Sequence, residues 1–179
     1  MAPFDAQDKK KETLDWVILR DGGIALYWRP EYLDEDLEWF RQQNYEIHCF
    51  DCEKWTHGGM HADVERSLNF PSFYGHNLDA LNDCLQEDLS VPEIGGTAVV
   101  LKRFDAFLAG RGGAHLLDER PEGKVLLDLF VRASRYFLLT GRRFVTLIQS
   151  DDPRIRFDSL GGIAPGWNWR ERLNKDRGL

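Results

Sequence analysis

Two short, almost wholly apolar runs constrain the fold of this chain more than any other feature. They are TAVVLKRF, which begins at Thr97, and RRFVTLIQ, which ends at Gln149. Runs of this kind are typical of strands buried on both faces, as parallel strands are. A helical pattern lies between them, from Pro121 to about Leu139. Because strands that alternate with helices form βαβ units, the two runs predict a parallel sheet of the α/β class.

Further elements of the same kind precede the first run. Tyr45–Cys52 (YEIHCFDC) alternates between apolar and polar residues, which predicts a strand. Helical spacing predicts helices over His61–Leu68 and from His76 to about Leu89. Together these elements predict one α/β domain over residues 45–150.

The two ends of the chain are expected to lie outside this domain. In residues 1–44 we expect a disordered start, a β-hairpin over Trp16–Trp28 that turns at Asp21-Gly22-Gly23, and a helix from Pro30. Residues 151–179 lose periodicity and gain Gly, Pro and charge, which predicts an appended tail.

Two tryptophans in that tail are open to two interpretations. Trp167 and Trp169 stand beside Arg170 and Arg172. Because Trp and Arg dominate binding hot spots, the four residues could anchor a partner. We favour the alternative, in which the two indoles dock the tail onto its own domain.

The overall charge bears on the class of partner. The chain has 179 residues, with 30 acidic and 23 basic side chains and a net charge of −7. This balance argues against direct binding to nucleic acid, whose affinity for proteins comes largely from Lys and Arg, and it favours a basic partner. No leader-like segment or apolar run of membrane-spanning length is visible, and three cysteines suit a reducing compartment, so we expect a cytoplasmic protein that does not bind membranes.

Chemistry of the enzymatic kind finds little support in the sequence. The candidate metal site is Cys49-x2-Cys52 followed by His57 and His61, which would supply four ligands for zinc. In an alternating strand, however, residues three apart point to opposite faces, so we favour a structural role for both cysteines. The other histidines are scattered, with no nucleophile and base nearby. We therefore expect no enzyme and no cofactor.

The predicted helix near residue 80 has one face of unusual charge. Leu78, Leu81 and Leu85 repeat at helical spacing and would bury one side. The other side carries Asp79 and Asp83, one turn apart, without a nearby cation. Like charges at this spacing destabilise a helix slightly, so the pair calls for an explanation outside the helix itself.

The stretch PSFYGHNLDALNDCL closely resembles the defining segment of the barstar family, intracellular inhibitors of the ribonuclease barnase. The resemblance covers roughly residues 45–150 and implies a small α/β domain with a three-stranded parallel sheet. It also implies a protein that blocks a basic ribonuclease or ribonuclease toxin and is not an enzyme. The matching residues are Pro71, Tyr74, Gly75, Asn77, Leu78, Asp79, Ala80, Leu81, Asp83, Cys84 and Leu85.

The resemblance also implies which residues contact the partner. In the family this helix and the loop before it plug the ribonuclease active site, where carboxylates take the place of RNA phosphates. Asp83 matches the main carboxylate and Asp79 the second, while Gly75 and Asn77 match contacts at the start of the helix. Four departures stand out: Phe73 replaces a tyrosine, Asn82 and Asp88 replace tryptophans, and Arg132 stands at the position of a glutamate. The expected partner-binding residues are Phe73, Gly75, Asn77, Asp79, Asn82 and Asp83.

Overall fold

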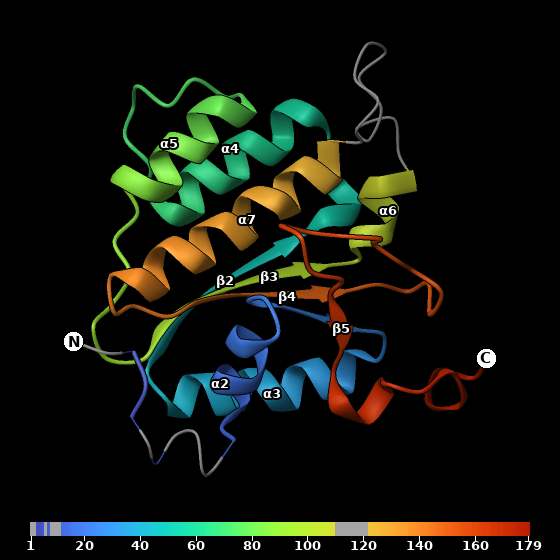
Figure 1. Ribbon diagram of the computed structural model, residues 1–179. Helices are drawn as coiled ribbons and strands as arrows, with labels where there is room; N and C mark the ends of the chain where they lie inside the picture. Colours follow the sequence, from blue (N-terminus) through green and yellow to red (C-terminus); the bar gives the residue numbers. More distant parts are fainter. Residues whose placement is uncertain (1–2, 6, 8–11, 110–121) are drawn as a thin grey trace.

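The structure, a computed structural model, describes residues 3–5, 7, 12–109 and 122–179. Five parallel strands form one sheet in the order β2-β3-β4-β1-β5. Helices cover both faces of the sheet (Figure 1). The strands are β1 (Ile24–Tyr27), β2 (Tyr45–Asp51), β3 (Gly96–Lys102), β4 (Phe144–Gln149) and β5 (Gly166–Trp167).

The helices divide between the two faces of the sheet. One layer contains α2 and α3, and the layer on the opposite face contains α4, α5 and α7 (Figure 1). Short 3-10 helices follow β2 and β5. The α-helices are α2 (Leu14–Arg20), α3 (Pro30–Gln42), α4 (His57–Leu68), α5 (Leu78–Glu87), α6 (Phe104–Ala109) and α7 (Glu122–Leu139), and the 3-10 helices are η1 (Cys52–Lys54), η3 (Trp169–Glu171) and η4 (Asn174–Arg177).

The alternation of side chains along each central strand explains the two layers. In β3, Val99 and Leu101 pack into the core beneath α4, α5 and α7, while Ala98 and Val100 pack into a second core beneath α2 and α3. All four are fully buried. The α/β class and the parallel sheet are therefore confirmed, because a strand covered on both faces must be apolar at every position.

The expectation of three strands is wrong, because the sheet has five. Both additional strands come from the segments expected to lie outside the α/β domain. β1 pairs with β4 from Ile24↔Thr146 to Tyr27↔Gln149, and β5 pairs with the other side of β1. The N-terminal segment therefore lies inside the sheet, and the C-terminal segment forms its edge.

The predicted hairpin over Trp16–Trp28 is also wrong, because its first half is helix α2. Asp21-Gly22-Gly23 ends that helix. The Gly22 N–H donates to the Leu19 carbonyl at 3.3 Å, and the Gly23 N–H donates to the Ile18 carbonyl at 2.8 Å. Gly22 and Gly23 have φ values of 110° and 81°, which only glycine adopts easily. This is a Schellman helix end, which uses the same residue types as a hairpin turn.

The buried Asp15 ties α2 to the sheet. Its carboxylate accepts a hydrogen bond from the Tyr45 hydroxyl at 2.7 Å and pairs with Arg143 at 3.0 Å. Near the start of the chain, the Pro3 carbonyl accepts a hydrogen bond from Arg143, whose guanidinium stacks on Phe4. These described residues of the predicted disordered start therefore contact the sheet layer.

The C-terminal segment is held by buried charged groups. Glu171 is fully buried and accepts hydrogen bonds from the backbone N–H groups of Trp28 and Arg29, at 3.0 and 2.8 Å, where α3 begins. Arg177 stacks on Trp167 with 4.2 Å to the ring centroid. Trp167 also packs, partly buried, against the larger core, which confirms for this residue the preferred interpretation that the tail docks onto its own domain, whereas Trp169 is 75% exposed.

Candidate functional site

The site predicted from the sequence consists of helix α5 and the loop that leads into it. Asn77 caps the helix: its Oδ1 accepts a hydrogen bond from the Ala80 N–H at 2.8 Å, and its Nδ2 donates to the Gly75 carbonyl at 3.1 Å. One amide side chain therefore joins the first turn to the loop. Both Gly75 and Asn77 are exposed.

The two faces of α5 differ as the sequence predicted. Leu81, Cys84 and Leu85 are buried, and the helix packs against α7. Asp79 and Asp83 are exposed on the helix. Within the described residues neither carboxylate forms an ion pair, and Asp83 accepts only a 3.3 Å hydrogen bond from the neighbouring Asn82 side chain. The helix thus presents two negative charges to solvent on a rigid backbone.

Burial of Tyr74 fixes the loop before α5. The Tyr74 ring is 5% exposed and packs against Phe70 at 5.3 Å between centroids. Its hydroxyl forms a hydrogen bond with Nδ1 of the buried His61 on α4, and its N–H donates to the Pro71 carbonyl at 2.9 Å. Burial raises the pKa of Tyr74 above its ordinary value, so the phenol keeps its proton.

His76 sets the direction of the backbone just before α5 begins. Its φ of 48° lies in the left-handed region, which costs free energy for a residue other than glycine. The ring compensates by a 2.8 Å contact between Nε2 and the Glu65 carboxylate on α4. The rings of His61 and His76 both contact the Tyr74 ring, with centroids 5.7 and 5.2 Å from it, and they stack on each other at 6.3 Å. The loop is thereby anchored to α4 at two points.

Asn82 lies between the two aspartates in sequence and joins α5 to α7. Its Oδ1 accepts hydrogen bonds from Gln86 Nε2 at 2.9 Å and from Arg132 Nη1 at 3.2 Å. Arg132 is exposed on α7. The side chain between the two aspartates is therefore an amide held by an arginine, and a positive charge lies beside the acidic face.

Phe73 occupies the tip of the same loop. Its side chain is 75% exposed, one of the most exposed large apolar side chains among the described residues. An isolated exposed aromatic ring next to charged groups is a common anchor in protein interfaces, since it loses little conformational entropy on binding.

The sequence did not reveal what supports the site. His61 was considered as a metal ligand and His76 as an isolated residue, yet both hold the loop. Glu65, the partner of His76, was not singled out. No local pattern could have identified these contacts, because they join α4 to a loop across tertiary structure.

The alternative zinc site does not form a cluster among the side chains that the structure describes. No group of three or more His, Cys, Asp or Glu in this part of the chain could hold a metal ion. Cys49 is exposed, whereas Cys52 is buried and its Sγ lies 3.9 Å from the Phe50 carbonyl. His61 is hydrogen-bonded to Tyr74, and the side chain of His57 lies outside the described set.

Helices long and apolar enough to cross a membrane are absent from the described residues.

Two matches with known proteins bear on the family of this chain. The family model described as "Barstar (barnase inhibitor)" matches residues 42–149, which is more than half of the chain. A protein of Bacillus subtilis (strain 168), named "Putative ribonuclease inhibitor YrdF", is 44% identical over 46 residues. That alignment covers 26% of this chain and 46% of the relative, so it spans about half of the relative's length. On the extent of the family match, the chain belongs to the barstar family.

Proposed function

We propose that this protein inhibits a basic ribonuclease, or a toxin of ribonuclease type, by placing Asp83 and Asp79 in its phosphate-binding site. The observation that carries the proposal is the exposed acidic face of α5, whose two aspartates have no cation partner among the described residues. The protein itself performs no catalysis in this role, and we expect it to act in the cytoplasm.

The chemistry of a ribonuclease site suits such a surface. A site that binds RNA phosphates is built from cationic side chains, and Arg in particular pairs with carboxylates through two parallel hydrogen bonds. A carboxylate on a helix is already positioned, so little conformational entropy is lost when it binds. The Asn77 cap and the anchored Tyr74 loop supply that rigidity here.

Electrostatics would also speed the encounter. A net charge of −7 and an acidic helix face attract a basic partner over distances of about a Debye length, roughly 8–10 Å at physiological salt. Association is therefore expected to slow as the salt concentration rises. Dissociation should depend more on the buried pairs made by Asp83.

The departures from the family pattern concern partner choice. Asn82 and Arg132 replace an aromatic and an acidic contact, and they are hydrogen-bonded to each other at 3.2 Å. Because like charges across an interface oppose binding, a fitting partner carries a neutral or acidic group opposite Arg132. The preferred ribonuclease therefore need not be barnase.

The test is inhibition of RNA cleavage, measured with a fluorogenic RNA substrate. Barnase is the first probe, followed by ribonuclease-type toxin domains encoded by the source organism. For an enzyme that the wild type inhibits, Asp83→Asn should weaken inhibition by about 30-fold or more, since losing one partner of a buried charge pair costs about 2–5 kcal/mol. Asp79→Asn should weaken inhibition less.

The matched control is Asp158→Asn, which removes an exposed aspartate from the C-terminal segment. It should leave inhibition unchanged. If Asp83→Asn inhibits as well as the wild type while folding normally, the proposed use of α5 is wrong. If Asp158→Asn weakens inhibition as much as Asp83→Asn does, the net charge of the protein rather than the acidic face of α5 governs binding.

A further inference from the structure

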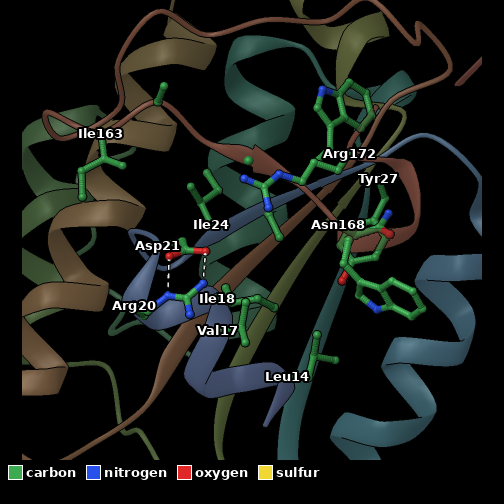
Figure 2. Close-up of a pocket in the computed structure, with 15 residues that line it drawn as sticks. Leu14, Val17, Ile18, Arg20, Asp21, Ile24, Tyr27, Ile163, Asn168 and Arg172 are labelled. Atoms are coloured by element: carbon green, nitrogen blue, oxygen red, sulfur yellow. Dashed lines mark hydrogen bonds and ion pairs between the residues drawn. The ribbon is translucent and has the colours of Figure 1, made fainter. Parts of the chain in front are cut away.

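A cavity lies at the opposite edge of the sheet from β2, between the N-terminal and C-terminal segments. Its volume is about 600 Å³, within the range of pockets that hold small molecules. Helix α2 and the start of β1 form one side, and the residues around β5 form the other (Figure 2). None of its lining residues belongs to α5 or to the loop before it. The apolar part of the lining includes Leu14, Val17, Ile18, Ile24, Ala25 and Ile163.

Small residues at the sheet edge leave this space open. Gly166 of β5 pairs with Ala25 of β1. A Cβ atom built on Gly166 would meet nothing within 4 Å, so its position opens into free space. Helix α2, which covers the neighbouring part of the sheet, ends at Arg20. The open position at residue 166 therefore lies at a cavity whose apolar lining is partly exposed at Leu14, Val17 and Ile163 and buried at Ile18, Ile24 and Ala25.

The outer part of the cavity lining is aromatic and aliphatic. Trp169 is 75% exposed and Ile163 is 40% exposed, and both line the cavity. Exposed apolar groups beside a cavity favour a ligand with an apolar body, because its binding removes their surface from water. Trp169 also lies beside Arg170, whose guanidinium is 5.7 Å from its ring centroid.

The charged groups at the cavity indicate the sign of the ligand. Arg20 and Asp21 satisfy each other through two hydrogen bonds, at 2.7 and 2.8 Å. Arg172 is exposed and has no carboxylate within hydrogen-bonding distance among the described residues. Arg20 is the main cause of the lowered pKa of the Asp21 carboxyl, and Arg172 lies close enough to Asp21 to contribute to this lowering. Among the lining residues, two guanidinium groups and one carboxylate leave an excess of one positive charge. Glu12, outside the lining, also acts on Arg20, so Arg172 is the cation that is left for a ligand.

The two arginines on either side of Arg172 that are partly or fully buried, Arg170 and Arg177, both have partners. Arg170 pairs with Glu35 and Asp36, and Arg177 donates to the backbone carbonyls of Pro153 and Glu171. Arg170 therefore docks the tail onto α3, and Arg177 joins segments of the tail to each other. Arg172, in contrast, extends toward Asp21 and Ile24 from the tail side of the cavity (Figure 2).

We propose that this cavity binds a small molecule with an apolar body and a single anionic group, such as a medium-chain carboxylate or an aromatic sulfonate. The body lies against Val17, Ile18 and Ile163, and the anion pairs with Arg172. Guanidinium groups suit this purpose, since they present parallel N–H donors to carboxylate or sulfonate oxygens. The site is separate from the acidic face of α5 and does not depend on inhibition of a ribonuclease.

The test is a fluorescence titration of the full chain with 8-anilino-1-naphthalenesulfonate, an aromatic anion whose emission rises in apolar surroundings. We expect saturable binding of one molecule per chain. Arg172→Gln should raise the dissociation constant about fivefold, the larger end of the range for an exposed ion pair. The control Arg156→Gln, which removes another exposed arginine of the C-terminal segment, should leave the dissociation constant unchanged.

A second variant tests the location. Gly166→Leu places a side chain into the open space and should abolish the saturable signal while thermal unfolding remains cooperative. Decanoate should displace the probe at lower concentration than decan-1-ol, because only the acid pairs with Arg172. If Gly166→Leu binds the probe like the wild type, the cavity is not the site. If Arg172→Gln has no effect, or the alcohol competes equally well, anion recognition is refuted.

Discussion

Glu171 offers a quantitative test of whether the C-terminal segment is part of the folded core. Its carboxylate is fully buried and accepts hydrogen bonds from the N–H groups of Trp28 and Arg29 and from the Asn168 side chain. The two backbone donors lie where α3 begins, so the negative charge also interacts favourably with the positive end of that helix. Glu171→Ala removes all of these contacts at once.

The expected loss can be estimated from the contacts. A hydrogen bond to a charged group contributes about 1.5–3 kcal/mol to the free energy of unfolding. Arg29 is exposed and Trp28 is partly buried, so water can hydrogen-bond to their N–H groups once the carboxylate is removed. The lower end of this range per hydrogen bond therefore applies. At about 1.5 kcal/mol for each of these three hydrogen bonds, we expect Glu171→Ala to reduce the free energy of unfolding by about 4–5 kcal/mol. With a urea dependence of about 2 kcal/mol per molar, the midpoint falls by about 2 M.

The assay is equilibrium unfolding in urea, followed by far-UV circular dichroism and tryptophan fluorescence. Glu31→Ala is the matched control, because Glu31 is an exposed acid in the first turn of the same helix. It should cost only about 0.3–1 kcal/mol through the helix dipole. If Glu171→Ala costs no more than Glu31→Ala, the carboxylate does not hold the tail and the C-terminal segment is an appendage.

Three further predictions concern individual side chains. Burial lowers the pKa of His48 below its ordinary value of 6.5. As the pH falls, His48 therefore takes up a proton in the unfolded chain before it does so in the folded chain, and the free energy of unfolding decreases. His48→Gln should flatten this decline in urea unfolding between pH 7.5 and 5. Of the three cysteines only Cys49 is exposed, so 5,5′-dithiobis(2-nitrobenzoate) should label this thiol before the other two, and Cys49→Ser should remove that first phase. Asn77→Ala should lower the free energy of unfolding by about 0.5–2 kcal/mol through loss of the cap, measured by thermal denaturation, and an unchanged midpoint would contradict the capping role.

The central part of the fold could be predicted because its signals are local. The runs at Thr97–Leu101 and Phe144–Gln149 are apolar at almost every position, and the structure places them as β3 and β4 between two layers of helices. The helix that begins at Pro30 was equally visible, since proline at the first turn and leucines at helical spacing are both local features.

The positions of the two added strands could not be predicted in the same way. Ile24–Tyr27 reads as a strand, but nothing in its residues specifies pairing with Phe144–Gln149 far along the chain. Asp21-Gly22-Gly23 is compatible with a hairpin turn and with a helix end. The helix is favoured because Asp15 reaches Tyr45 and Arg143, and these contacts exist only once the sheet has formed.

For the candidate site, the helix face could be predicted and its support could not. The apolar spacing of Leu81 and Leu85 fixes which side of α5 is buried, and the aspartates must then face outward. The contacts of His76 with Glu65 and of Arg132 with Asn82 join separate elements. The sequence alone cannot show that these side chains meet.

The place of β1 in the sheet has a consequence for how the chain is made. Among the described strands β1 is synthesised first, yet its neighbours β4 and β5 follow β2 and β3 along the chain. Its backbone N–H and C=O groups must therefore wait for their partners until residues 144–149 have been synthesised. Contacts this distant in sequence slow folding and leave strand edges exposed meanwhile. Chains that stop before Phe144 leave β1 with no strand to pair with, and we expect them to aggregate or to be degraded.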